Sequence, residues 1–191
     1  MFSKKIYYVG VVLIISLVVS GCGGAPKNEV TDPCKKDPKW YSNEDESCPK
    51  GFLCGVGKAG SGQSSTAEFK AKSLARNDLS ASLAQFTSRE LRAAYQELEG
   101  DAARAAFDKL FQTDRFATVV EATITNSIVH IKTDAICDSK NWYWVQVKKD
   151  KDGIDFKSLF EEASDDPQLS DSDRKFIKES MDWADDVLKN R

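Results

Sequence analysis

The chain has 191 residues, and its 27 Lys and Arg against 30 Asp and Glu give a formal net charge of -3. This length favours a single domain. The acidic balance argues against nucleic-acid binding, which needs a clustered positive surface. A single histidine excludes a metal centre built from several histidines and leaves little general-base capacity near neutral pH.

The first 21 residues have the pattern of a secretory signal. Lys4 and Lys5 precede an apolar run over residues 6–19, and two small residues follow it. A positive start, an apolar core of this length and a small-residue end predict a signal peptide. The run is short for a spanning helix, which needs about 20 apolar residues. An uncleaved N-terminal anchor is the alternative.

The residues at the end of this signal, Val19-Ser20-Gly21-Cys22, resemble the bacterial lipobox. The resemblance implies cleavage before Cys22 and acylation of its thiol and of the new amino terminus. Two glycines and no aspartate follow Cys22, which by resemblance to Gram-negative sorting rules implies the outer membrane. Several acyl chains make a stable anchor. We therefore expect membrane lipid as a partner, through Cys22.

Cleavage leaves 191 − 21 = 170 residues and removes two lysines but no acid, so the mature net charge is 25 − 30 = -5. Residues 22–39 are rich in Gly, Pro, Lys and Asp and predict a flexible tether. Residues 40–191 then form a single domain.

The other four cysteines are Cys34, Cys48, Cys54 and Cys137. Outside the cytoplasm, four cysteines predict two disulfides with three possible pairings. We prefer Cys34 with Cys48, which closes a local loop, and Cys54 with Cys137, which joins two strands. No pair has the C-x-x-C spacing of zinc ribbons or thioredoxin-like sites.

The first elements in chain order are a short strand and a long helix. Residues 52–57 predict the strand, and Gly60-Ser61-Gly62 predicts a turn. Ser65 with Glu68 matches a capping box, after which apolar residues at 3–4 spacing run to Phe86. A second helical segment is expected after residue 88, broken or kinked near residues 100–101.

The following segment changes to a strand pattern. From residue 118 the composition is β-branched, and residues 128–131 and 142–147 predict two strands joined by a turn at 138–141. This predicts an antiparallel hairpin closed near Cys137, with the second strand ending at residues 152–153.

Two helices complete the chain, one over residues 156–163 and a last one that begins after Ser170 and carries apolar residues as far as 188. The predicted order is β-α-α-β-β-α-α. This order indicates an α+β fold, with a small antiparallel sheet and helices packed on one face.

Several motifs have a chemical and a structural interpretation. Residues 55–60 match G-x-G-x-x-G, but the long helical segment that follows is not a βαβ unit, so close helix–strand packing is favoured over dinucleotide binding. Residues 150–153 resemble part of a calcium loop, but its first and twelfth positions are Lys148 and Leu159. The acidic residues from Glu161 onward fit a solvated surface and helix N-termini. No cofactor or metal is expected.

Two further features bear on function. His130 lies on a predicted strand, with Ser127 on the opposite face and Asp134 about 13 Å along it, so no local catalytic triad exists. Trp142 and Trp144 share a strand with Tyr143 and Val145, so aromatic side chains occupy both faces. One face is core, and the other is either covered by a helix or loop or exposed as a partner surface.

The combined pattern resembles the LPP-twenty family of bacterial surface lipoproteins, which includes flagellar outer-membrane lipoproteins. The resemblance extends from about Trp40 to Leu188. Its residues are Trp40, Gly55, Gly57, Ala59, Ala71, Leu74, Ala75, Asp78, Leu79, Tyr143, Val145, Val147, Leu169, Ser170, Arg174, Ile177, Ala184 and Leu188. It implies an envelope assembly or scaffold protein without catalytic residues. The four additional cysteines depart from the family pattern.

These observations predict a non-enzymatic, lipid-anchored envelope protein that acts through contacts with envelope proteins or with itself. The alternatives are an outer-membrane-anchored activator of a cell-wall synthase, that is, a penicillin-binding protein, and an envelope hydrolase that uses His130.

Overall fold

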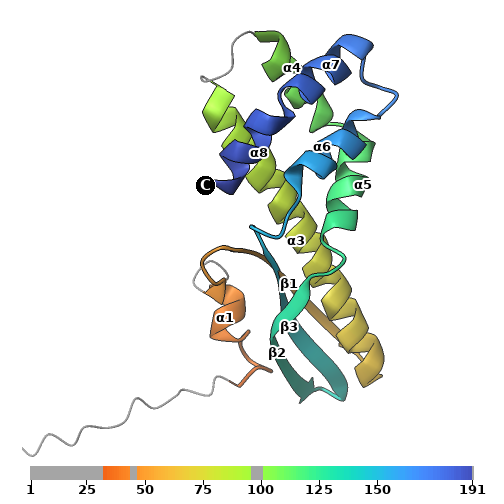
Figure 1. Cartoon of the computed structure of the whole chain (residues 1–191). Helices are drawn as coiled ribbons and strands as arrows, with labels where there is room; N and C mark the ends of the chain where they lie inside the picture. The colour runs from red at the N-terminus through yellow and green to blue at the C-terminus, as the bar shows by residue number, and fades with distance from the viewer. Residues whose placement is uncertain (1–31, 44–46, 96–100, 191) are drawn as a thin grey trace, which may run out of the picture. The chain divides into compact units, whose positions relative to one another are not determined.

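The computed structural model describes residues 32–43, 47–95 and 101–190 (Figure 1). The contacts within the chain divide it into Met1–Val30 and Thr31–Arg191, and only the second unit is described here. The predicted signal, Cys22 and the first part of the predicted tether lie outside the described residues. The second unit has the predicted α+β fold.

Three strands form an antiparallel sheet, with β3 (Lys140–Asp150) between β1 (Phe52–Ser61) and β2 (Ile128–Cys137). The hairpin of β2 and β3 confirms the predicted one. Its two loop residues, Asp138 and Ser139, have φ angles of 49° and 59°, which a two-residue hairpin turn of type I′ requires. β1 includes Gly60 and Ser61, the first two residues of the predicted turn, because Gly60 pairs with Trp142 and Ser61 with Asn141.

The long helix α3 (Ser64–Ala94) crosses one face of the sheet, over β1 and β3 (Figure 1). Its residues Ala67, Ala71, Ala75, Leu79 and Leu83 are fully buried at 4-residue spacing, whereas Leu74 is exposed. A Cβ at Gly55 or Gly57 would meet the backbone of α3, so these glycines serve the close packing that the sequence predicts.

The ends of α3 differ from the prediction. The N-cap is Gln63, without a side-chain cap, so the capping box predicted at Ser65 is wrong. The helix also continues past Ser88, whose hydroxyl donates to the carbonyl of Gln85 inside it. The second helical segment is therefore part of α3 as far as Ala94, and a separate helix, α4 (Asp101–Leu110), follows it.

The remaining helices gather around the second half of α3 (Figure 1). They are α5 (Asp114–Thr123), α6 (Phe156–Ser164), α7 (Asp171–Glu179) and α8 (Met181–Lys189). Phe107 of α4 and Phe160 of α6 are fully buried, with ring centroids 5.5 Å apart. Together with α4, these helices extend the hydrophobic core that begins between α3 and the sheet.

Two sequence predictions in this region are wrong. The β-branched segment from residue 118 is helix α5, because Phe116, Val119 and Val120 are buried at helical spacing and outweigh the strand propensity. The last predicted helix is two helices, α7 and α8, which meet at Ser180. The N-cap predicted at Ser170 is confirmed, as part of a capping box with Asp173.

Candidate functional site

A short segment covers the face of the sheet opposite α3. We call residues 32–43 the N-terminal strap; it ends in the helical turn α1 (Lys39–Ser42). Cys34 is disulfide-bonded to Cys137 of β2, and Trp40 Nε1 donates to Thr133 Oγ1 at 3.1 Å. The predicted tether, residues 22–39, is therefore too long. Its last residues belong to the domain, which starts no later than Asp32.

An ion pair and two tryptophans hold the middle of the strap. Asp37 accepts hydrogen bonds from Lys58 Nζ at 2.6 Å and from Trp144 Nε1 at 2.9 Å. Lys58 Nζ also lies 5.3 Å from the ring centroids of both Trp142 and Trp144, within cation–π range. The hydrogen bond from Lys58 lowers the pKa of Asp37, and the one from Trp144 lowers it further. Asp37 thus stays ionised at neutral pH.

The tryptophan strand is therefore covered. Trp144 is 1% exposed and Trp142 is half-buried, because the strap lies over the face that they share. The proposal of Trp142 and Trp144 as a partner surface is not supported for Trp144, whose ring is not available to another molecule. Of the two interpretations that the sequence left open, cover by a loop is the one that the structure shows.

The disulfides are Cys34–Cys137, with an S–S distance of 1.96 Å, and Cys48–Cys54, with one of 2.10 Å. The number of disulfides is as predicted, but the preferred pairing is wrong. Cys54 and Cys137 lie on the two outer strands, with β3 between them, and they are opposite different ends of β3. Cys34 lies beside the hairpin because the strap runs back over the sheet.

The outer strand β2 is the exposed part of the sheet. Ile128, Val129 and Ile136 are 59%, 43% and 75% exposed. They are three of the five large hydrophobic side chains that are exposed among the described residues, and the other two are on α3. Lys132 reaches Glu68 of α3 at 3.3 Å. The sequence prediction recognised the strand but not its exposure, which follows from its place at the edge.

His130 is exposed on β2, where the register with β3 shifts between Val129 and Ile131. It is thus the extra residue of a β-bulge, a position that no sequence pattern indicated. Ser127, expected on the opposite face of the strand, is buried and lies before β2 begins. The structure brings neither Ser127 nor Asp134 into hydrogen-bond contact with His130 in the described residues.

Three hollows on the described surface are lined in part by α3. One of about 620 Å³ lies between the start of β1 and the second half of α3 and is lined by the second disulfide together with Lys50, Arg89 and Lys151. Another, of about 280 Å³, is lined by apolar and charged side chains of α3 and of the segment between α5 and β2, including Phe69 and Ile124. The third, of about 440 Å³, lies between α3 and α5. His130 lines none of the three. Among the described residues, no group of His, Cys, Asp and Glu has the arrangement of a metal site.

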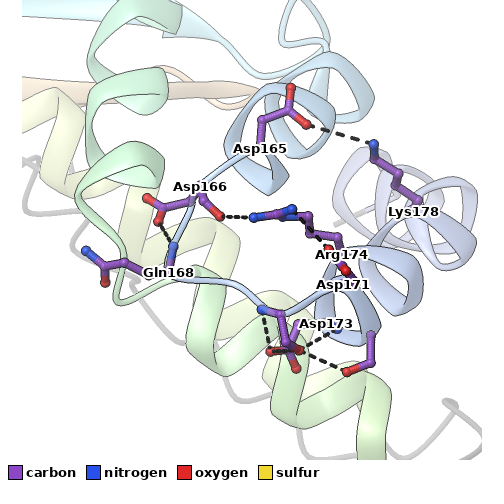
Figure 2. A network of polar contacts seen from close by, with 9 residues as sticks. Asp165, Asp166, Gln168, Asp171, Asp173, Arg174 and Lys178 are labelled. Atoms are coloured by element: carbon purple, nitrogen blue, oxygen red, sulfur yellow. Dashed lines mark hydrogen bonds and ion pairs between the residues drawn. The ribbon is translucent and has the colours of Figure 1, made fainter.

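The predicted acidic run has a structural role at the helical end (Figure 2). Asp173 accepts from Ser170 in the capping box and from Lys109 Nζ of α4 at 2.9 Å. The Arg174 guanidinium donates to the carbonyl of Asp166, and Asp166 Oδ1 accepts the Gln168 N–H. The helix N-terminus was predicted, but the contact with α4 was not.

The chain matches no protein-family model, no curated protein and no solved structure with which it was compared. No helix in the described ranges is both long and apolar enough to cross a membrane. The candidate functional site is thus the sheet, with one face covered by the N-terminal strap and with the outer strand β2 exposed.

Proposed function

We propose that this chain is a lipid-anchored component of a bacterial outer membrane, without a catalytic role, that acts through protein–protein contacts. The observation that carries the proposal is the pairing of the cysteines. Four of the five form two disulfides, which are typical of proteins outside the cytoplasm. The fifth is Cys22, which follows the apolar signal at the lipobox position.

The strap sets how far the domain extends from such an anchor. Cys34 is fixed to the sheet and follows Cys22 by twelve residues. Twelve residues span at most about 40 Å when fully extended. A lipid on Cys22 thus keeps the hairpin end of the sheet within about 40 Å of the membrane surface.

The surface of the described domain supports an assembly role. The exposed apolar side chains are concentrated on one outer strand, as at interaction surfaces. His130, the residue required by the hydrolase alternative, is an exposed bulge residue that lines none of the three hollows. The motif order shared with the LPP-twenty lipoproteins supports the same proposal.

The test is metabolic labelling with a fatty-acid analogue in cells that express the whole chain. The wild-type protein should incorporate the label and sediment with membranes, and Cys22→Ser should not incorporate it. A matched control is Cys34→Ser/Cys137→Ser, which changes two other cysteines and should keep the label. A labelled Cys22→Ser, or an unlabelled wild type, would contradict the proposal.

A further inference from the structure

The outer strand β2 has a free edge with defined limits. In the part of the chain that the structure describes, β2 pairs only with β3. The bulge at His130 interrupts one end of the edge. At the other end, Cys34 Sγ lies 3.5 Å from the carbonyl oxygen of Ile136. The open stretch is therefore 131–135, and its midpoint is Thr133.

The hairpin register determines which backbone groups face outward on this stretch. Cys137 and Lys140 flank the two-residue turn, and such a flanking pair is hydrogen-bonded. Alternate residues back along β2 repeat this pattern toward β3. The residues between them, including Lys132 and Asp134, direct their N–H and C=O groups away from the sheet. They are a template for another antiparallel strand.

The side chains along this stretch are complementary to their own copy. In an antiparallel pair of two β2 strands centred on Thr133, Lys132 lies opposite Asp134 of the second copy, and Asp134 lies opposite its Lys132. Opposite charges at directly facing positions stabilise a strand pair, whereas like charges destabilise it. In one chain, Asp134 makes no side-chain hydrogen bond or ion pair with a described residue.

One exposed hydrophobic side chain lies at the end of this stretch. Ile136 is 75% exposed and pairs with Asn141, on the face of the sheet that carries α3. Helix α3 lies over β1 and β3 and leaves this side chain uncovered. Ile128 lies beyond the bulge, and its pairing with Lys148 places it on the opposite face. A second copy on the β2 edge would shield part of Ile136 from water in both copies.

The other edge of the sheet, on β1, is partly occupied. The Val56 N–H of β1 donates to Asp78 Oδ2 of α3 at 2.9 Å, so a backbone donor of this edge already has a partner. A two-fold pair through β2 places the same edge of both copies against each other, so this interface closes at two copies. A central lysine also disfavours pairing with a strand that offers no acid opposite it.

We propose that two copies of this chain pair through their β2 strands, antiparallel about Thr133, and form one continuous six-stranded sheet. This inference rests on the proposed assembly function and names its partner as a second copy. The pairing uses only residues of the described domain.

The test uses the mature, disulfide-bonded lipoprotein in detergent and native mass spectrometry, which gives the number of chains and their acyl mass together. Wild type should be a dimer. Lys132→Glu places Glu opposite Asp, and Asp134→Lys places Lys opposite Lys. Each variant alone should therefore dimerise at least about tenfold more weakly. Mixed together, the two variants present opposite charges at both positions and should form a heterodimer, which their different masses identify.

The control for surface charge is Lys70→Glu, which makes the same reversal on the exposed side of α3 and should dimerise as wild type does. Lys132→Glu also removes the contact with Glu68, whereas Asp134→Lys breaks no described contact and remains informative if the first variant fails to fold. A monomeric wild type, a complex with another protein alone, or mixed variants that stay monomeric would overturn the proposal. Wild-type monomers that carry the acyl mass would overturn the proposed β2 dimer but not the lipid anchor. Dimers without the acyl mass would overturn the lipid anchor but not the dimer.

Discussion

The sheet with its strap and the group of helices α4 to α8 share the long helix α3, but they are held together differently. The sheet has α3 on one face and, among the described residues, the short strap and Ser47 on the other, and both disulfides are in this part. The helices bury a core of Phe107, Phe156 and Phe160 and have no cysteine. A thin sheet has little core of its own, so covalent bonds supply what apolar burial supplies among the helices.

The largest expected effect is the loss of the Cys34–Cys137 disulfide. It links residues 103 apart, whereas Cys48–Cys54 links residues six apart. Because a cross-link restricts the unfolded chain more when its loop is longer, Cys34→Ser/Cys137→Ser should lower the free energy of unfolding by about 4 to 5 kcal/mol. Cys48→Ser/Cys54→Ser should lower it by about 2 kcal/mol. Guanidinium unfolding measures both, and equal losses would show that loop entropy does not explain the difference.

The next effect concerns the contact between sheet and helix. A Cβ at Gly55 would lie 2.6 Å from Leu79 Cα and would also meet the backbone of Ala75, so strand and helix must separate. Gly55→Ala should cost about 3 kcal/mol of unfolding free energy. Gly62→Ala is the control, since a Cβ there meets nothing within 4 Å. Equal midpoints for the two variants in chemical unfolding would refute the close packing.

A smaller effect should follow at the helical end from Asp173→Asn. The hydrogen bond from Ser170 lowers the pKa of Asp173, and the one from Lys109 lowers it further. Loss of the charged cap should cost about 1 to 2 kcal/mol near pH 7. Asp171→Asn is the matched control, because Asp171 is fully exposed and an exposed pair contributes little.

The pH dependence of this effect has a definite sign. Since the pKa of Asp173 is lower in the folded chain than in the unfolded one, its stabilisation is complete above the unfolded value of about 3.9. It is lost as the pH falls through the lowered folded value. The difference in unfolding free energy between wild type and Asp173→Asn should therefore shrink toward pH 2. A difference that grows on acidification would contradict the assigned shift.

The smallest effect is that of Asp37→Asn on the strap. Asparagine still accepts from Trp144 but loses the charge that faces Lys58, a pair that is about one-third exposed. The loss should be about 0.5 to 1 kcal/mol. Amide hydrogen exchange should accelerate in residues 32–43 and stay unchanged in α7 and α8. Uniform acceleration would mean that the strap is not an independent unit.

Local patterns predicted the features that depend on neighbouring residues. The hairpin, the N-cap at Ser170 and the glycine contact with the helix follow from turn chemistry, capping and the absence of a Cβ. The error at α5 is also local, since β-branched composition was given more weight than the helical spacing of Phe116, Val119 and Val120.

Local patterns do not predict contacts between residues that are far apart in the sequence. The strap has a polar composition typical of a tether, and only the folded sheet shows that Asp37 meets Lys58 and that Cys34 meets Cys137. The open edge of β2 likewise depends on strand order, which the hairpin alone does not determine. The sequence therefore predicted which cysteines and tryptophans belong to the candidate site, but not which of them lie in contact.

The most direct test of the account is the mass of the N-terminal peptide of the chain purified from its native membrane. The account predicts a peptide that begins at Cys22 and carries acyl chains on its thiol and its amino group, with the other four cysteines oxidised. A peptide that begins at Met1, or one with an unmodified Cys22, would contradict the lipid anchor and with it the proposed function.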